Sequence, residues 1–424
     1  MLEMRKMKDS GIEWIGEIPE GWRTINPKAL FTQRKDKAQK GERQLTSSQQ
    51  YGILYQDDYM ELTGSKVVTV EKDFDILKHV EAGDFVISMR SFQGGLEYST
   101  KSGAISSAYV MLVPNLELVY PRFYRWLLKS SVYIDALQRT TNMVRDGQAM
   151  RYSNFAQVRL FTLPLDEQKS RADFLDLECS SIDKILFKTR SSIEEYKKLK
   201  QAVITQAVTK GVRGEREMKD SGVEWIGEIP KEWDILDLVA HTSMLTPMRD
   251  RPENLDGPIP WIRIEDFDGK YISSSKASLG VSKETVRSMN LKIYPVGTIL
   301  FTSSCIMGKC AIVSRELVSN QRFIGIIPDQ NTCENFLYYL MLSNSERMNY
   351  LATGALQANL SRSSFEHLKV QFPSYQEQKE ISDYLDTKCA EIDKLIAKKE
   401  QLVKELESYK KSLIYEVVTG KREV

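Results

Sequence analysis

Apolar residues recur at intervals of three, four and seven positions along two long segments of the chain. One segment covers residues 167–208 and the other covers residues 377–419, and neither contains proline or glycine. This spacing places the apolar side chains on one stripe of an α-helix, with Lys and Glu filling most other positions. At 1.5 Å per residue, about forty residues form a helix roughly 60 Å long. The pattern therefore predicts two long amphipathic helices.

Each stripe needs a surface to pack against, because a long helix with one apolar stripe is rarely stable alone. Two matching stripes in one chain favour an antiparallel pair that forms a coiled-coil spacer. The alternative is two separate helices, each buried on its own domain. At the start of the second helix, Ser374 and Glu377 are spaced as a capping box. The residues expected to pack in the spacer are Leu175, Ile182, Ile185, Leu186, Ile193, Leu199, Val203, Leu385, Ile392, Leu395, Ile396, Val403, Leu406 and Leu413.

The chain contains an internal repeat with an offset of about 210 residues. Residues 7–19 (MKDSGIEWIGEIP) recur as residues 218–230 (MKDSGVEWIGEIP), and a tryptophan follows each copy, Trp22 and Trp233. The two helices repeat each other in the same register. Between these shared parts, the two halves diverge. The order is opening motif, variable region and helix, followed by the same three again, which predicts a pseudo-two-fold architecture presenting two different surfaces.

Both variable regions combine strands and helices. β-branched and aromatic runs bounded by turn residues predict strands at 67–70, 85–88, 108–112, 298–302, 310–313 and 323–327, and helices are expected at 120–137 and 334–351. The expected fold class is α+β, with two mixed α/β domains separated by the antiparallel helices. The expected boundaries are 1–165 for the first domain, 166–212 for the central helix, 213–373 for the second domain and 374–424 for the C-terminal helix.

Composition narrows the class of protein. A length of 424 residues suggests two or three domains, and 42% hydrophobic with 28% charged residues is an ordinary globular balance. No apolar run is long enough to span a membrane, and the N-terminus has no signal-peptide pattern, so a soluble cytoplasmic protein is expected. Five cysteines show neither disulfide nor zinc spacing, so no metal is expected. With a net charge of +1, any basic surface must arise by local clustering.

Several polar loops of the variable regions carry side chains suited to DNA. Arginine pairs with guanine and Asn or Gln with adenine in the major groove, whereas Lys, Ser and Thr suit phosphate contacts. Any single one of these residues also fits an ordinary solvated loop, so the prediction rests on the set. The candidates are Arg34, Lys35, Lys37, Arg43, Gln44, Arg90, Gln93, Asn142, Arg145, Gln148, Arg151, Arg249, Arg251, Ser303, Ser304, Lys309, Gln321, Arg322, Gln357, Asn359 and Arg362.

Sequence patterns for catalysis are missing. Lys309 follows a glycine, but neither the upstream glycine spacing nor the next residue fits a phosphate loop. The histidines, at positions 79, 241 and 367, are isolated, and no nucleophile with an obvious base lies near any of them in sequence. Glu167 and Glu377 each precede a lysine by two positions, as in some nuclease motifs, but both open a helix, where acidic residues favour the helix dipole. The sequence predicts no catalytic residue.

Taken together, these features resemble the specificity subunit of type I restriction–modification systems. The resemblance rests on Trp-Ile-Gly-Glu-Ile-Pro at residues 14–19 and its twin, the Glu-Gln-Lys helix starts at 167 and 377, residues 83–88, and residues 354–360 before Pro373. It covers nearly the whole chain, although residues 147–150 match residues 354–359 only loosely.

The resemblance implies a noncatalytic DNA-specificity subunit with two target-recognition domains, each reading one half of a bipartite double-stranded DNA site. Two modification (methyltransferase) subunits would dock on the shared frame, and restriction (translocase/endonuclease) subunits would join them. No cofactor is expected in this chain, because S-adenosylmethionine, ATP and Mg would belong to those partners. The alternative is a helical scaffold that displays two protein-binding domains.

Overall fold

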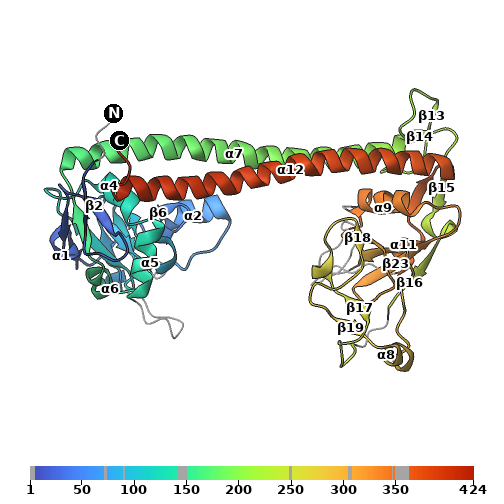
Figure 1. Cartoon of the computed structure of the whole chain (residues 1–424), viewed down its shortest axis with the longest axis horizontal. Coiled ribbons are helices and arrows are strands. Elements are labelled where there is room, and N and C mark those ends of the chain that lie inside the picture. Colours follow the sequence, from blue (N-terminus) through green and yellow to red (C-terminus); the bar gives the residue numbers. More distant parts are fainter. Residues whose placement is uncertain are drawn as a thin grey trace. The chain divides into compact units, whose positions relative to one another are not determined.

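The computed structural model describes residues 5–70, 74–88, 91–140, 150–247, 251–303, 308–345, 347–348 and 362–424. The chain folds into two compact units, a first unit of residues 1–190 with 401–424 and a second unit of residues 191–400. Two long helices, α7 (Leu165–Lys210) and α12 (Tyr375–Val418), each contribute to both units (Figure 1). The expected helices at 167–208 and 377–419 are therefore confirmed to within two residues at each end.

The remaining elements divide between the units. The first unit contains β1 (Met7–Asp9), β2 (Glu17–Pro19), β3 (Arg23–Ile25), α1 (Pro27–Leu30), β4 (Phe31–Arg34), β5 (Leu45–Ser48), β6 (Gly52–Tyr55), α2 (Gln56–Thr63), η1 (Phe74–Ile76), β7 (Lys78–Val80), β8 (Phe85–Ile87), α3 (Ser91–Gly94), β9 (Glu97–Tyr98), β10 (Gly103–Ile105), β11 (Val110–Pro114), α4 (Pro121–Leu127), α5 (Ser131–Arg139), α6 (Tyr152–Gln157) and β12 (Leu160–Thr162). The second contains β13 (Met218–Asp220), β14 (Glu228–Pro230), β15 (Asp234–Asp237), η2 (Leu238–Ala240), β16 (Thr242–Leu245), β17 (Ile259–Ile262), η3 (Ile264–Asp266), β18 (Tyr271–Ile272), β19 (Gly280–Val281), α8 (Lys283–Ser288), β20 (Ile299–Thr302), β21 (Cys310–Val313), β22 (Val318–Ser319), β23 (Phe323–Pro328), α9 (Glu334–Ser343), α11 (Arg362–Glu366) and β24 (Lys369–Phe372).

Each variable region contains its own central sheet, and the two sheets have related strand orders. In the first unit the strand order is β4-β11-β8-β9, and in the second it is β16-β23-β20-β21-β18. The pairs among the first four strands are antiparallel in both sheets. Gly83 and Gly297 precede the inner strands β8 and β20, have positive φ angles of 107° and 86°, and each donates its N–H to a backbone carbonyl of the neighbouring strand segment. The divergent sequences therefore adopt related α+β domains, as the repeat predicts.

Most of the predicted strands are present. Five of the six predicted runs coincide with β8, β11, β20, β21 and β23. The prediction at 67–70 is wrong, because those residues are irregular and the amide side chain of Gln44 occupies the backbone groups of Val70. The helix expected at 120–137 is interrupted near Ser130, whose side chain caps α5, and α9 ends at Ser343.

Within each unit the two long helices pack against each other in antiparallel directions. In the first unit, Leu175, Ile182 and Leu186 of α7 share a core with Leu413 and Val417 of α12. In the second unit, Ile204, Ala207 and Val208 of α7 share a core with Ile381, Leu385 and Cys389 of α12. The two helices therefore pair with each other, as the matching stripes predict. Each variable domain also packs on them.

Salt bridges between the helices repeat with the same offset. Lys410 contacts Asp183 in the first unit, and Lys200 contacts Asp393 in the second, both with N···O distances of 2.6 Å. Each residue of one pair lies about 210 positions from its counterpart in the other. The duplication has therefore preserved both the apolar stripe and the register of the antiparallel contact.

Three of the residues predicted to pack between the helices are instead exposed. Ile185, Leu199 and Leu395 are 48%, 48% and 42% exposed. Each stands one position before a more buried residue (Leu186, Lys200 and Ile396), and a step of one residue turns the side chain by about 100°. The buried predicted residues are Leu175, Ile182, Leu186, Ile193, Leu385, Ile392 and Leu413, and the half-buried ones are Val203, Ile396, Val403 and Leu406.

A buried tryptophan fixes each opening motif to the start of a long helix. Trp22 donates its indole N–H to Glu167, and Trp233 donates to Glu377. The amide of Glu377 also donates to the hydroxyl of Ser374, which confirms that half of the predicted capping box. The carboxylate of Glu377, however, accepts from the indole of Trp233, so the expected reciprocal contact is replaced by a tertiary one.

Candidate nucleic-acid interface

Four candidate residues of the second unit lie where strands of its central sheet begin or end: Ser303, Lys309, Gln321 and Arg322. Thr302, the last residue of β20, pairs with Phe323 of β23. Ser303 donates its N–H to the carbonyl of Arg322, and Thr302 donates to that of Lys309. Three loops are thereby brought together. The side chains of Lys309, Gln321 and Arg322 are exposed at these strand ends, whereas Ser303 is buried.

The corresponding strand ends of the first unit also carry candidate DNA-contact residues. Arg34 ends β4 opposite Met111 of β11, and Gln93 lies in α3, directly after β8. Lys35 and Lys37 continue from β4 and are exposed, as is Gln93. Equivalent strand ends of the two related sheets therefore present different polar residues in the two units.

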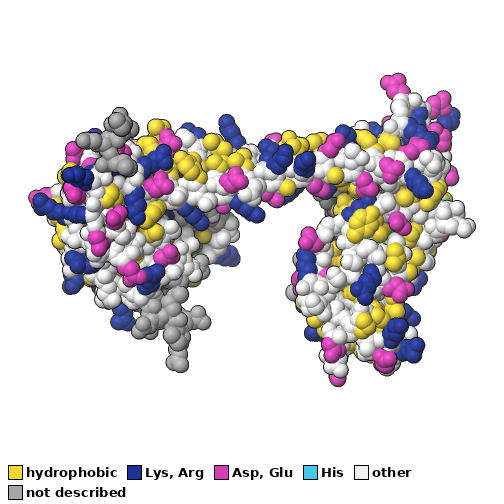
Figure 2. Space-filling model, in the orientation of Figure 1, with side chains coloured by type: hydrophobic (Ala, Val, Ile, Leu, Met, Phe, Trp, Pro, Cys, Tyr) yellow, Lys and Arg dark blue, Asp and Glu magenta, His cyan; other side chains and the backbone are white. Residues whose placement is uncertain are grey.

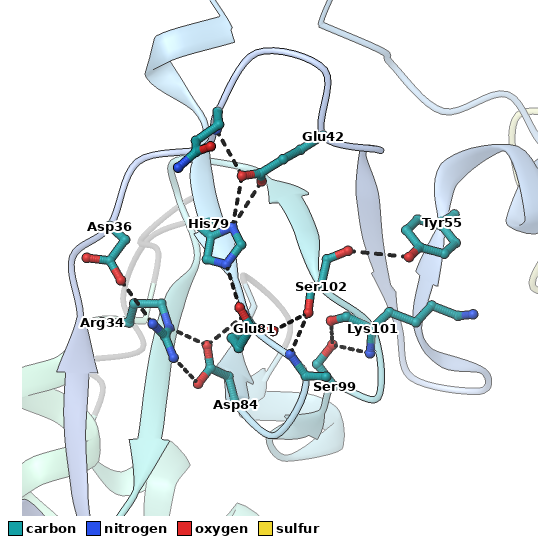
Figure 3. A network of polar contacts seen from close by, with 12 residues as sticks. Arg34, Asp36, Glu42, Tyr55, His79, Glu81, Asp84, Ser99, Lys101 and Ser102 are labelled. Atoms are coloured by element: carbon teal, nitrogen blue, oxygen red, sulfur yellow. Dashed lines mark hydrogen bonds and ion pairs between the residues drawn. The ribbon is translucent and has the colours of Figure 1, made fainter.

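Arg34 is engaged inside the domain. Its guanidinium donates to both carboxylate oxygens of Asp84, at 2.6 and 3.1 Å, and to Asp36 at 2.9 Å (Figure 3). The hydrogen bonds to Asp84 raise the pKa of Arg34 above its ordinary value. Because Asp84 is buried, this pair holds the end of β4 against the loop before β8. Arg34 thus orients the chain that leads to Lys35 and Lys37.

His79 lies between two carboxylates in the same network (Figure 3). Its Nδ1 is 3.0 Å from Glu42, and its Nε2 is 3.0 Å from Glu81. Burial lowers the pKa of His79, but the contacts with Glu42 and Glu81 outweigh it and raise the pKa. Ser102 hydrogen bonds to Glu81 and extends the network to the loop before β10. The network connects residues 36–42 to β7 and to the next loop.

Arg43 and Gln44 also have partners within the first unit. The guanidinium of Arg43 stacks 3.6 Å from the centre of the Tyr55 ring and bonds to Asp57 and Asp58, all at the surface. Gln44 donates to the carbonyl of Val70 at 2.8 Å and accepts from its N–H at 2.9 Å. The amide of Gln44 thus supports the wall of a cavity of about 300 Å³.

Three further candidates lie on other segments. Arg151 is exposed at the start of α6, and Arg251 is exposed ahead of β17. Arg362 begins α11 and pairs with Glu366 at 2.7 Å. Arg90, Asn142, Arg145, Gln148, Arg249, Ser304, Gln357 and Asn359 lie outside the described residues.

Comparison with known proteins finds relatives of the whole chain and of its second half. A family model described as "Type I restriction modification DNA specificity domain" matches residues 231–405. The chain is 34% identical to the type I restriction enzyme MjaIX specificity subunit of Methanocaldococcus jannaschii over 41% of each chain. It is 23% identical to the putative MjaX specificity subunit of the same organism over 99% of this chain and 98% of that one. A solved structure from a study of complex assembly in the type I R-M system covers 96% of this chain and 99% of its own, with a TM-score of 0.74 at 12% identity.

This chain is similar to the specificity subunits of type I restriction–modification systems. The expected resemblance and the expected fold class are therefore confirmed. The HsdS subunit of Thermoanaerobacter tengcongensis also shares the fold, with a TM-score of 0.54 at 13% identity and coverage of 96% of this chain and 98% of that one.

The residues that attach each variable domain to the long helices were not predicted from the sequence. Asp176 of α7 accepts from Arg122, Arg125 and Trp126 of α4. Asp386 of α12, at the equivalent repeat position, accepts from Lys270 and from the hydroxyl of Tyr339 in α9. The repeated aspartate was a signal in the sequence, but its partners differ in type and position between the two domains, so the repeat alone could not identify them.

Among the helices of the described ranges, none combines the length and apolarity needed to cross a membrane. Within the same ranges, no three or more His, Cys, Asp or Glu side chains are grouped as metal ligands. The described cysteines, at positions 179, 310, 333 and 389, are buried thiols, and burial raises the pKa of Cys179 to about 11.

Proposed function

We propose that this chain selects the DNA sequence acted on by a type I restriction–modification complex, with each recognition domain reading one half of a bipartite double-stranded site. The observation that carries the proposal is the pair of related central sheets, whose equivalent strand ends present different exposed residues. One sheet carries Lys35, Lys37 and Gln93 there, and the other carries Lys309, Gln321 and Arg322. Because the two surfaces differ, the two half-sites are unrelated in sequence.

The basic residues at these strand ends suit phosphate contacts, and the amides suit base edges. We assign Lys35, Lys37 and Lys309 to phosphates, and Gln93, Gln321 and Arg322 to bases or the adjoining sugar–phosphate. Arg34, Arg43 and Gln44 have a positioning role instead, since their polar groups are engaged with Asp84, with Asp57 and Asp58, and with Val70. The exposed Arg151, Arg251 and Arg362 extend the candidate surface.

The chain itself supplies no catalytic step in this proposal. Two modification subunits bind the duplicated frame and methylate adenine with S-adenosylmethionine, and restriction subunits use ATP and Mg for translocation and cleavage. A pseudo-two-fold frame offers two equivalent sites for one partner, as a symmetric dimer does. The complex functions in the cytoplasm, where its DNA is found.

The test is to map methylated adenines in DNA treated with the reconstituted complex. An asymmetric, bipartite methylated sequence supports the proposal. Replacing residues 231–373 with the corresponding domain of another specificity subunit is expected to change one half-site and leave the other. Methylation without a defined sequence, or a change in both half-sites, contradicts it. A protein scaffold that does not bind DNA would show no steep salt dependence of DNA affinity, which separates the alternative.

A further inference from the structure

The opening motifs form two hairpins with the same backbone geometry. β1 pairs with β2 as β13 pairs with β14, so that Asp9 lies opposite Glu17 and Asp220 lies opposite Glu228. The turns also repeat, since Ser10 donates to the carbonyl of Gly16 as Ser221 donates to that of Gly227. Residues 7–19 and 218–230 differ at one position, isoleucine against valine. The fold accounts for the buried part of this identity.

The charged positions of the hairpins are also identical. Each copy carries one lysine and three carboxylates: Lys8, Asp9, Glu13 and Glu17 in the first, and Lys219, Asp220, Glu224 and Glu228 in the second. The three carboxylates are exposed in both copies. Figure 1 shows β13 and β14 projecting from the second unit, and Figure 2 shows charged side chains over that hairpin.

Only part of this surface identity has a structural reason. Asp9 and Asp220 accept the N–H of the glycine two positions later and so stabilise the turn. Glu13 pairs with Arg139, but the two side chains are 88% and 67% exposed, so the pair adds little stability. Within the described residues, Glu17 and Glu228 have no hydrogen bond or ion pair from their side chains. The fold does not require an acidic residue at either position.

The long helices show that exposed residues of this chain diverge when nothing holds them. Exposed Glu194 of α7 corresponds to Lys404 of α12, which reverses the charge. Exposed Leu177 corresponds to Thr387, although the buried positions around both match. The same duplication has thus changed exposed helix positions while keeping every charged position of the hairpins. A function other than folding explains this difference.

We infer that the two hairpins are twin docking surfaces for the modification subunit, one copy of which binds each hairpin through a basic patch. Two identical surfaces on an otherwise divergent chain fit one partner present twice. Three carboxylates against one lysine repel DNA phosphates, so the ligand is a protein with complementary cations. A tryptophan lies beside the acidic residues in each copy. Trp225 is 44% exposed with the guanidinium of Arg347 over its ring, and Trp14 is half-buried.

This inference rests on the proposed function and assigns the docking to the hairpins. The experiment uses the full chain, the modification subunit of the same system, and native mass spectrometry to count bound copies. Glu13→Lys with Glu17→Lys reverses the first surface, and Glu224→Lys with Glu228→Lys reverses the second. Each pair is expected to weaken binding of one copy about tenfold or more and leave the other copy unchanged. Reversal of both surfaces is expected to remove both copies.

The control is Glu61→Lys with Glu117→Lys, an equal charge reversal at two exposed positions outside the hairpins. Melting curves check folding, and the neutral variants Glu17→Gln and Glu228→Gln decide the matter if a reversed pair unfolds, with a smaller loss of affinity expected. Two copies bound at wild-type affinity by the reversed variants overturn this inference alone. If the wild-type chain binds no modification subunit, the proposed function fails as well.

Discussion

Trp22 donates its indole N–H to the carboxylate of Glu167 at 3.1 Å, across 145 residues of sequence. The indole is fully buried, and Glu167 lies in the first turn of α7. Trp233 and Glu377 repeat the contact at 3.0 Å across 144 residues. Each pair ties an opening motif to the start of a long helix, so the motif and the helix form one frame that is used twice. The variable domains are attached to this frame and can diverge without altering it.

Glu167→Ala is expected to destabilise the first unit by about 3 kcal/mol. The substitution leaves Arg171, whose side chain is 2% exposed, without its carboxylate partner, and it removes the acceptor of Trp22. Hydrogen exchange measured by mass spectrometry should show faster exchange in residues 5–190 and 401–424. Glu377→Ala is the matched variant and should act on residues 191–400. Equal acceleration in both units by either variant would contradict the assignment.

The repeat and the periodicity were sufficient to predict the frame. Helix ends were within two residues of the prediction because proline, glycine and the apolar stripe delimit both helices. Side-chain direction was harder to predict, since steps of three residues accumulate rotation. The predicted residue Leu199 lies off the buried stripe, whereas Ile204 is buried and was not among the predicted residues. Periodicity locates a helix well. It identifies the buried positions only when the rotation of successive side chains around the helix axis is counted along the whole helix.

Ile182→Asp and Ile185→Asp form a matched pair on one helix. Ile182 is buried among residues of both helices, whereas Ile185 is 48% exposed. Ile182→Asp places a charge in the core and is expected to lower the free energy of unfolding by about 3 kcal/mol or more. Ile185→Asp should change it by less than about 0.5 kcal/mol. Chemical denaturation of both variants provides the measurement, and similar losses would show that the helices do not pack as described.

The histidine network predicts a pH dependence of the first unit. The contacts with Glu42 and Glu81 raise the pKa of His79 in the folded state above the ordinary value of 6.5. Protonated His79 therefore stabilises the fold fully below about pH 6.5, and this stability is lost as pH rises through the folded pKa. His79→Gln should lower stability at pH 6 and have little effect at pH 9. Thermal unfolding across this range is the measurement, and a constant difference between the two proteins would exclude the role.

The DNA-contact candidates illustrate what residue type cannot predict. Arg34 and Gln44 suit base recognition by chemistry, but Asp84 and Val70 occupy their polar groups in the fold. These partners lie 50 and 26 residues away in sequence, and no local pattern connects them. Lys35 and Lys37 have the same basic character but project from the end of β4 and are exposed. Tertiary pairing therefore divides one basic segment into positioning residues and available cations.

Lys35→Ala with Lys37→Ala is expected to weaken DNA binding by the assembled complex and to reduce its salt dependence. If each lysine neutralises one phosphate, the slope of log affinity against log salt should fall by about 2. Non-specific DNA should be affected as strongly as the target sequence, because phosphate contacts carry no sequence information. Fluorescence anisotropy titrations at several salt concentrations measure both effects. Lys394→Ala with Lys398→Ala removes the same charge from exposed positions of α12 and should leave the slope unchanged. An unaltered slope after loss of Lys35 and Lys37 would remove this edge of the sheet from the DNA-binding surface.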